Sequence, residues 1–115
     1  MNYTHDQKDN IAIFELEGSL LSEADRESIK KDFVDYQDKG IVHFLIDLSN
    51  LKHINSTGLG IFISLYTRVR GKGGEMVICN PTSNISNLLS ITKLNSIFTI
   101  VDDRDKGLEV LKNNA

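Results

Sequence analysis

The sequence contains only one cysteine and one proline, and both numbers limit what kind of protein it can be. A single cysteine, Cys79, cannot form an intramolecular disulfide, so the chain is not one of the small secreted domains stabilised by disulfides. There is a single proline, Pro81, and no low-complexity stretch typical of a linker. With 115 residues, 40% of them hydrophobic, the chain can bury one core but not two. We therefore predict a single domain over residues 1–115.

Long apolar runs are also missing. Unbroken runs such as residues 44–46 are far shorter than the ~20 residues of a membrane-spanning helix. The first ten residues are mostly polar and lack the apolar segment of a signal peptide. We expect a cytoplasmic protein that does not insert into a membrane.

The net charge is −3, from 16 acidic and 13 basic residues, which argues against nucleic acid as a partner. The charges are unevenly distributed. Residues 1–50 contain 11 acids and 5 bases, whereas residues 51–100 contain 1 acid and 5 bases. A change of charge would therefore have its largest local effect in the middle of the chain.

Hydrophobic periodicity predicts alternating strands and helices. Ala12, Phe14 and Leu16 share one face of a strand, and the near-continuous apolar run 41–48 is typical of a strand buried on both faces. A helix is expected from Ser22, which has an acid three positions later, to Gly40. The predicted strands are 3–8, 11–17, 41–48, 75–79 and 97–101, and the later helices are 59–69, a third around 85–89, and 108–111. This order predicts an α/β fold, a mixed sheet flanked by about four helices.

The segment Ile54-Asn55-Ser56-Thr57-Gly58-Leu59-Gly60 carries most of the functional information. In one interpretation Ser56 or Thr57 only caps the helix, and the glycines only allow close packing. In the other, Ser56 is phosphorylated, because a helix N-terminus stabilises a dianionic group beside its unpaired amides. The segment lacks the spacing of a dinucleotide-binding loop, a phosphate-binding P-loop or a nucleophile elbow.

The predicted second helix leaves a question about two of its apolar residues. Ile61 and Leu65 are four apart, on a different side from the expected core stripe. That stripe consists of Leu59, Phe62, Tyr66 and Val69, with Ile63 beside it. Either Ile61 and Leu65 pack under a neighbouring loop, or they form an exposed apolar strip on which a protein partner docks.

Residues 46–60 (IDLSNLKHINSTGLG), followed by 73–79 (GGEMVIC), resemble a STAS domain, and specifically the stand-alone bacterial anti-sigma factor antagonists. The resemblance covers essentially the whole chain, including its length, its element order, the turn at residues 16–18 and the segment 94–98. The motif that carries it is Asp-Ser-Ser/Thr-Gly-Leu-Gly, which here includes Asn55, Ser56 and Thr57.

The resemblance implies a partner-switching protein without catalytic residues. In that family the unphosphorylated form binds an anti-sigma factor, and a sigma factor is released. The anti-sigma factor is often a serine protein kinase of the histidine-kinase-like ATPase type, which phosphorylates the motif serine, and a serine phosphatase reverses this. By position in the motif, the phosphorylated residue here is Ser56, flanked by Asn55, Thr57, Gly58, Leu59 and Gly60. The partner surface would include the loop at Gly18 and Leu21 and the helix residues Ile61 and Leu65.

Two residues depart from the family pattern: Asn55 and Leu21 stand where aspartates are usual. Both differences remove negative charge near Ser56, so the electrostatics of the partner are left open. Two alternatives remain: a STAS protein that regulates a stress-signalling, secretion or transport complex, and a small-molecule or nucleotide binder that uses the loop 55–60.

No catalytic, cofactor or metal site is predicted. His5, His43 and His53 are widely spaced and have no companions at metal-ligand spacing. Glu15 and Glu17 are expected in solvent, Asp47 is expected to cap the loop after its strand, and Cys79 is expected to be a small apolar core residue. No nucleophile, base and orienting group can be assembled from these residues.

Overall fold

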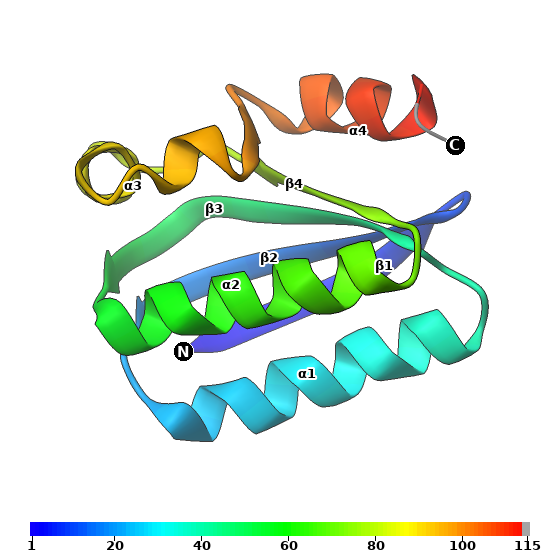
Figure 1. Ribbon diagram of the computed structural model, residues 1–115, viewed down its shortest axis with the longest axis horizontal. Coiled ribbons are helices and arrows are strands. Elements are labelled where there is room, and N and C mark those ends of the chain that lie inside the picture. Colours follow the sequence, from blue (N-terminus) through cyan, green and yellow to red (C-terminus); the bar gives the residue numbers. More distant parts are fainter. Residues whose placement is uncertain (114–115) are drawn as a thin grey trace.

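The computed structural model describes residues 1–113, and it has a mixed five-stranded sheet in the order β1-β2-β3-β4-β5 (Figure 1). β1 runs antiparallel to β2, and the other neighbours are parallel. The strands are β1 (Asn2–Lys8), β2 (Ile11–Leu20), β3 (His43–Ile54), β4 (Glu75–Cys79) and β5 (Thr99–Val101). Asn114 and Ala115, the last residues of the predicted domain, lie outside the described part.

Four α-helices connect or follow the strands. They are α1 (Glu23–Asp38), α2 (Ser56–Gly71), α3 (Ser83–Ile91) and α4 (Arg104–Asn113), with a short 3-10 helix η1 (Leu94–Ser96) before β5. The predicted α/β fold with a mixed sheet and about four helices is therefore confirmed. Within residues 1–113, no helix combines the length and the hydropathy needed to cross a bilayer.

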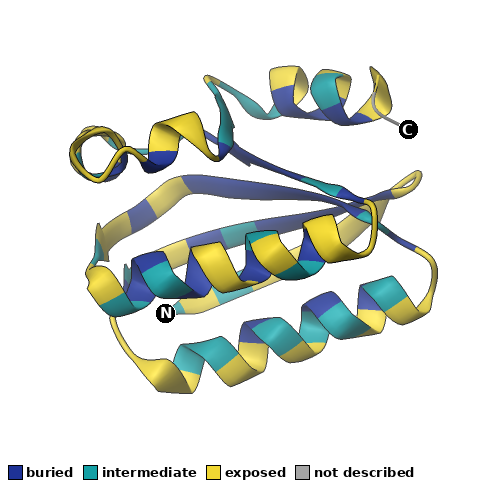
Figure 2. Cartoon of the chain, viewed as in Figure 1, coloured by how far each residue is buried: buried dark blue, intermediate teal, exposed yellow. Residues whose placement is uncertain are grey.

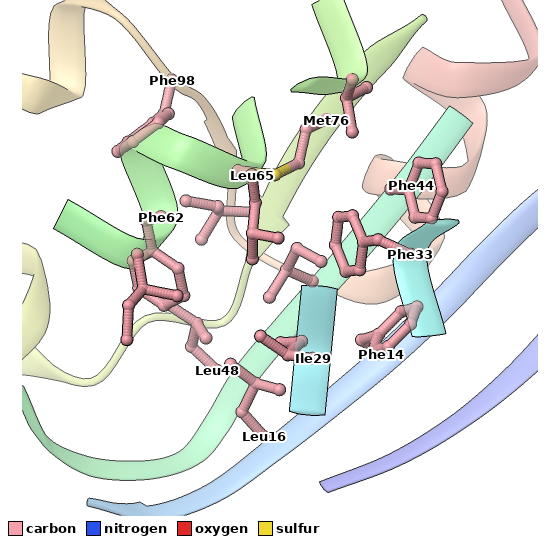
Figure 3. Close-up of a cluster of buried hydrophobic side chains, with 14 of the residues drawn as sticks. Phe14, Leu16, Ile29, Phe33, Phe44, Leu48, Phe62, Leu65, Met76 and Phe98 are labelled. Atoms are coloured by element: carbon pink, nitrogen blue, oxygen red, sulfur yellow. The ribbon is translucent and has the colours of Figure 1, made fainter. Parts of the chain in front are cut away.

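Alternate residues of the central strands face two separate clusters of buried side chains. Phe14, Leu16, Phe44 and Leu48 face the larger cluster, which α1, α2, α3 and η1 cover (Figure 3). Leu45 faces the smaller cluster, which α4 covers on the other side of the sheet. Figure 2 shows the result: the central strands are buried, while the outer faces of α1, α2 and α4 are exposed. The predicted inward face of β2 is confirmed.

Several predicted boundaries are wrong because strand pairing continues beyond the apolar pattern. β2 extends through Gly18 to Leu20, and β3 continues to Ile54 through residues 49–54, which the sequence suggested were a loop. Two register shifts between β2 and β3 accommodate this extension, and Gly18 has a left-handed φ of 85°. The longer strands carry the β2–α1 loop and the start of α2 to the same end of the sheet.

An ion pair between buried Asp47 and partly exposed Arg104 attaches α4 to the sheet. Asp47 in β3 is only 4% exposed, and its Oδ2 accepts a hydrogen bond from Arg104 Nη2 at 2.9 Å. Its Oδ1 accepts from the backbone N–H of Ser49 at 3.0 Å. Burial raises the pKa of Asp47, but the hydrogen bonds from Ser49 and Arg104 outweigh burial and hold that pKa below its ordinary value. The loop that Asp47 was predicted to cap is part of β3, so that prediction is wrong. Asp47 instead accepts the N–H of Ser49 within the strand and anchors α4 through Arg104.

Arg104→Met should lower the free energy of unfolding by about 1–3 kcal/mol, because the Asp47 carboxylate stays buried without its charged partner. The folded-state pKa of Asp47 is lowered, so its stabilising contribution is present above about pH 4 and lost as the pH falls further. The variant should show a weaker dependence of stability on pH in this acid range. Urea unfolding across pH 3–7 measures both effects. Lys106→Met, which removes only an exposed pair with Asp102, should change stability by less than about 0.5 kcal/mol; an equal effect would contradict the assignment.

Candidate partner-binding site

Asn55 is the N-cap of α2, so the interpretation in which Ser56 or Thr57 caps this helix is wrong. The Asn55 side-chain oxygen Oδ1 accepts a hydrogen bond from the backbone N–H of Gly58 at 2.9 Å. Asn, Ser and Thr are all good capping residues. Because Asn55, Ser56 and Thr57 follow one another, the sequence alone did not show which of them is the cap. β3 extends to Ile54, so the helix begins directly after it and Asn55 takes the capping position.

Ser56 is the first residue of α2, and it is exposed. The helix has no acidic residue in its first turn, and exposed Lys52 and His53 precede it in β3. A phosphate on Ser56 would lie beside the positive end of the helix dipole. The position therefore satisfies the two physical requirements for a phosphorylated serine: access for an enzyme and stabilisation of the added charge.

Gly58 is buried where α2 approaches β2 and β3 closely. A Cβ built at this position would lie 2.4 Å from the backbone oxygen of Leu20 and 2.5 Å from Cγ1 of Ile54. Gly60 is different, because a Cβ there would meet only Arg26, at an ordinary contact distance of 3.7 Å. Gly58 is thus required for close packing, as one interpretation of the motif held, and Gly60 is not.

The same Asn55 side chain also holds the β2–α1 loop. Its Nδ2 donates a hydrogen bond to the backbone oxygen of Leu21 at 3.1 Å. An aspartate could cap the helix equally well, but it has no N–H to donate to Leu21. Asparagine at this position therefore links the loop that contains Leu21 to the start of α2. The side chain of Leu21 is left 46% exposed.

Asn55→Ala should lower the free energy of unfolding by about 1 kcal/mol through loss of the cap. Asn55→Asp should keep the cap and change stability by less than about 0.5 kcal/mol, while the backbone amide NMR signals of Leu21 and Ser22 shift. Denaturant unfolding and amide chemical shifts measure the two effects separately. Unchanged loop signals in Asn55→Asp would contradict the bridging role.

The prediction that Ile61 and Leu65 form an exposed strip is wrong. They are 0% and 3% exposed, and both belong to the larger core cluster (Figure 3 labels Leu65). Instead Ile63 is 43% exposed. α2 packs against α1 as well as the sheet, and Tyr66 contacts Phe98 next to η1, so its buried arc is wider than one stripe. Ile63 lies on the part of the helix surface that stays exposed.

We call the surface formed by Leu21, Ser56, Gly60 and Ile63 the Ser56 face. Positions 56, 60 and 63 are spaced by four and three residues, so they lie on one side of α2. Figure 1 shows the β2–α1 connection beside the start of this helix, which agrees with the hydrogen bond from Asn55 to Leu21. The face therefore combines an exposed serine with two exposed apolar side chains, and Gly18 lies shortly before it in β2.

The other candidate residues do not gather into a chemical site. Within residues 1–113, no three His, Cys, Asp or Glu side chains are placed to hold a metal ion. His43 and Cys79 are buried, and burial raises the pKa of the Cys79 thiol to about 12, so it stays protonated. Glu15 lies 3.9 Å from Arg104, in the ion-pair cluster around Asp47, and Glu17 is exposed.

Comparison with known proteins identifies the family. The model of the STAS domain family matches residues 2–107, so the chain belongs to this family, as the motif suggested. BtrV of Bordetella bronchiseptica, assigned as an anti-sigma factor antagonist, is 27% identical over 112 residues, which cover 97% of this chain and 96% of BtrV. The anti-sigma F factor antagonist of Paenibacillus polymyxa is 33% identical over 70 residues, or 61% of this chain and 60% of that protein.

Solved structures show the same fold. The unphosphorylated form of the anti-sigma factor antagonist SpoIIAA has a TM-score of 0.82 and 12% identity, covering 97% of each chain. The phosphorylated form of SpoIIAA from Bacillus has a TM-score of 0.74 and 14% identity, covering 99% of this chain and 100% of that one. The architecture is therefore the one that SpoIIAA keeps in both phosphorylation states.

Proposed function

We propose that this protein is an anti-sigma factor antagonist whose binding is switched off by phosphorylation of Ser56. The observation that carries the proposal is an exposed serine as the first residue of α2, next to two exposed apolar side chains. Membership of the STAS family and the names of the relatives, which are anti-sigma factor antagonists, support it.

In the unphosphorylated state, the Ser56 face contacts an anti-sigma factor, which then no longer holds its sigma factor. Leu21 and Ile63 supply apolar contact area, and the backbone around Gly18 and Gly60 allows close approach. The motif residues Asn55, Gly58 and Leu59 hold the start of α2 in place, and Thr57 flanks Ser56. The protein acts as a binding module in the cytoplasm, and it needs no catalytic group, cofactor or metal.

Phosphorylation would add roughly −1.5 to −2 charges in the middle of this face. The helix N-terminus stabilises the phosphate in the free protein, so the fold does not change. A partner would have to bury that charge beside the apolar side chains Leu21 and Ile63, which is costly. The anti-sigma factor is itself the serine kinase, of the histidine-kinase-like ATPase type, and a serine phosphatase restores binding.

Affinity capture from the source cell tests this proposal. The bait would be the full chain as wild type, Ser56→Ala and Ser56→Glu, with bound proteins identified by mass spectrometry. We expect a histidine-kinase-like ATPase with the first two baits and its loss with the third. Capture of membrane-transport or other signalling subunits in its place would show that this STAS domain serves a different output.

A further inference from the structure

A positively charged hollow lies between α1 and α2, which run side by side on one face of the sheet (Figure 1). Its volume is about 590 Å³. We call it the basic hollow, and it is lined by Lys30, Ser64, Thr67, Arg68, Gly71 and Lys72. The lining contains three cations, two hydroxyl groups and no acidic residue.

The cations of the basic hollow are not neutralised by the protein itself. Arg70, which points elsewhere, pairs with Glu75 at 2.9 Å. In the part of the chain that the structure describes, no carboxylate lies within 4.0 Å of the charged groups of Lys30, Arg68 or Lys72. α2 contains no acidic residue at all. Three free positive charges therefore gather on a chain whose net charge is −3.

The basic hollow is continuous with the Ser56 face along α2. Thr67 lines the hollow and follows Ile63 by four residues, which places both on the same side of the helix. Ser56 and Arg68 are twelve residues apart, which corresponds to about 18 Å along a helix. A protein interface of standard size, about 800 Å² on each partner, easily covers both.

We propose that the basic hollow binds an acidic segment of the same protein partner that covers the Ser56 face. This inference rests on the proposed function. A protein segment fits the hollow better than a small molecule, because small-molecule pockets have few polar groups, whereas five of the six residues that line this hollow carry a positive charge or a hydroxyl group. Carboxylates of the segment pair with Lys30, Arg68 and Lys72. The rest of the chain is net acidic, so such a segment is attracted to the hollow in preference to most other parts of the surface, and the hollow fixes the orientation in which the partner docks.

A peptide of eight glutamates is the probe for the first test. Titrated into the ¹⁵N-labelled full chain at low salt, it should shift backbone amide signals of residues 64–72 and those around Lys30. The triple variant Lys30→Glu, Arg68→Glu, Lys72→Glu should bind the peptide at least tenfold more weakly. A control triple, Lys8→Glu, Lys93→Glu, Lys112→Glu, changes the net charge equally at exposed lysines outside the hollow and should bind as the wild type does. Amide spectra report whether each variant is folded. If the triple variant does not fold, the single substitution Arg68→Gln is the milder change with which the same weakening is measured.

Several results would overturn the proposal. Shifts at other lysines, or equal weakening in the control triple, would mean that the hollow is not the site. Tighter binding of inorganic tripolyphosphate than of the peptide at the same amides would make it a small-anion site. A dimer that only the hollow triple abolishes would identify a second copy of this chain as the occupant.

The ATPase captured by the wild type is the probe for the second test. The hollow triple should bind it about tenfold more weakly, mainly through a slower association rate that depends on salt. Unchanged affinity would overturn the proposal. Ser56→Glu should still bind the glutamate peptide. A wrong assignment of the Ser56 face can therefore be distinguished from a wrong assignment of the hollow.

Discussion

Gly58→Ala should be among the most destabilising single substitutions in this protein, lowering the free energy of unfolding by about 3 kcal/mol. The added methyl group would lie 2.4 Å from the backbone oxygen of Leu20. That oxygen cannot move freely, because Leu20 is paired with Ile54 at the end of the β2–β3 ladder. The start of α2 must therefore move away from the sheet, and the Asn55 cap is disturbed with it. Thermal unfolding should show a fall in Tm of about 10 °C or more.

Gly60→Ala is the matched control, two residues further along the same helix. Its methyl group meets only the flexible side chain of Arg26, at 3.7 Å. Alanine favours helix over glycine by about 1 kcal/mol, so this variant should be equally stable or slightly more stable than the wild type. Equal destabilisation in both variants would contradict the distinction between a glycine required for packing and one with room for a side chain.

Ser56→Glu should weaken binding of the captured ATPase by at least 100-fold, about 2.7 kcal/mol. A carboxylate at this position would be buried in the complex among the apolar contacts of Leu21 and Ile63. The folded protein should not be destabilised, because a negative charge in the first turn of a helix contributes about 0.3–1 kcal/mol of stability. Isothermal titration calorimetry gives the affinity, and thermal unfolding gives the stability.

Ser83→Glu is the control for this substitution. Ser83 is the exposed first residue of α3, as Ser56 is of α2, so the same charge enters at the same helix position outside the Ser56 face. Its affinity for the ATPase should stay within about threefold of the wild type, far less than one interfacial charge can cost. A comparable loss in both variants would show that net charge, rather than the Ser56 face, controls binding.

The sequence predicts the architecture well and the exposed face of α2 poorly. The apolar run 41–48 and the period-two pattern of β2 depend on local burial, and they predicted that the two central strands exist but not where they end. Whether Ile61, Ile63 and Leu65 are buried or exposed depends on how many elements pack around α2. The helical period alone does not specify that number. α1 and the segment next to η1 cover parts of α2 that would otherwise be exposed.

Two features of the site could not be predicted because they join distant residues. Asn55 bonds to Leu21, 34 positions earlier. Lys30 lines the basic hollow together with Arg68 and Lys72, which follow it by about forty residues. The unequal distribution of charge in the sequence indicated a basic middle segment, but only the packing of α1 against α2 brings two of its charges, Arg68 and Lys72, together with Lys30 from the acidic first half.

The phosphorylation state of Ser56 in the partner complex is the most direct test of the central claim. The purified complex with the captured ATPase would be incubated with Mg²⁺-ATP and followed by intact-mass and peptide-mapping mass spectrometry, with size exclusion to report release. We expect one phosphate on the peptide that contains Ser56, and dissociation of the complex in parallel with its appearance. Phosphorylation only at another residue, or a fully modified Ser56 in a complex that stays intact, would contradict the account.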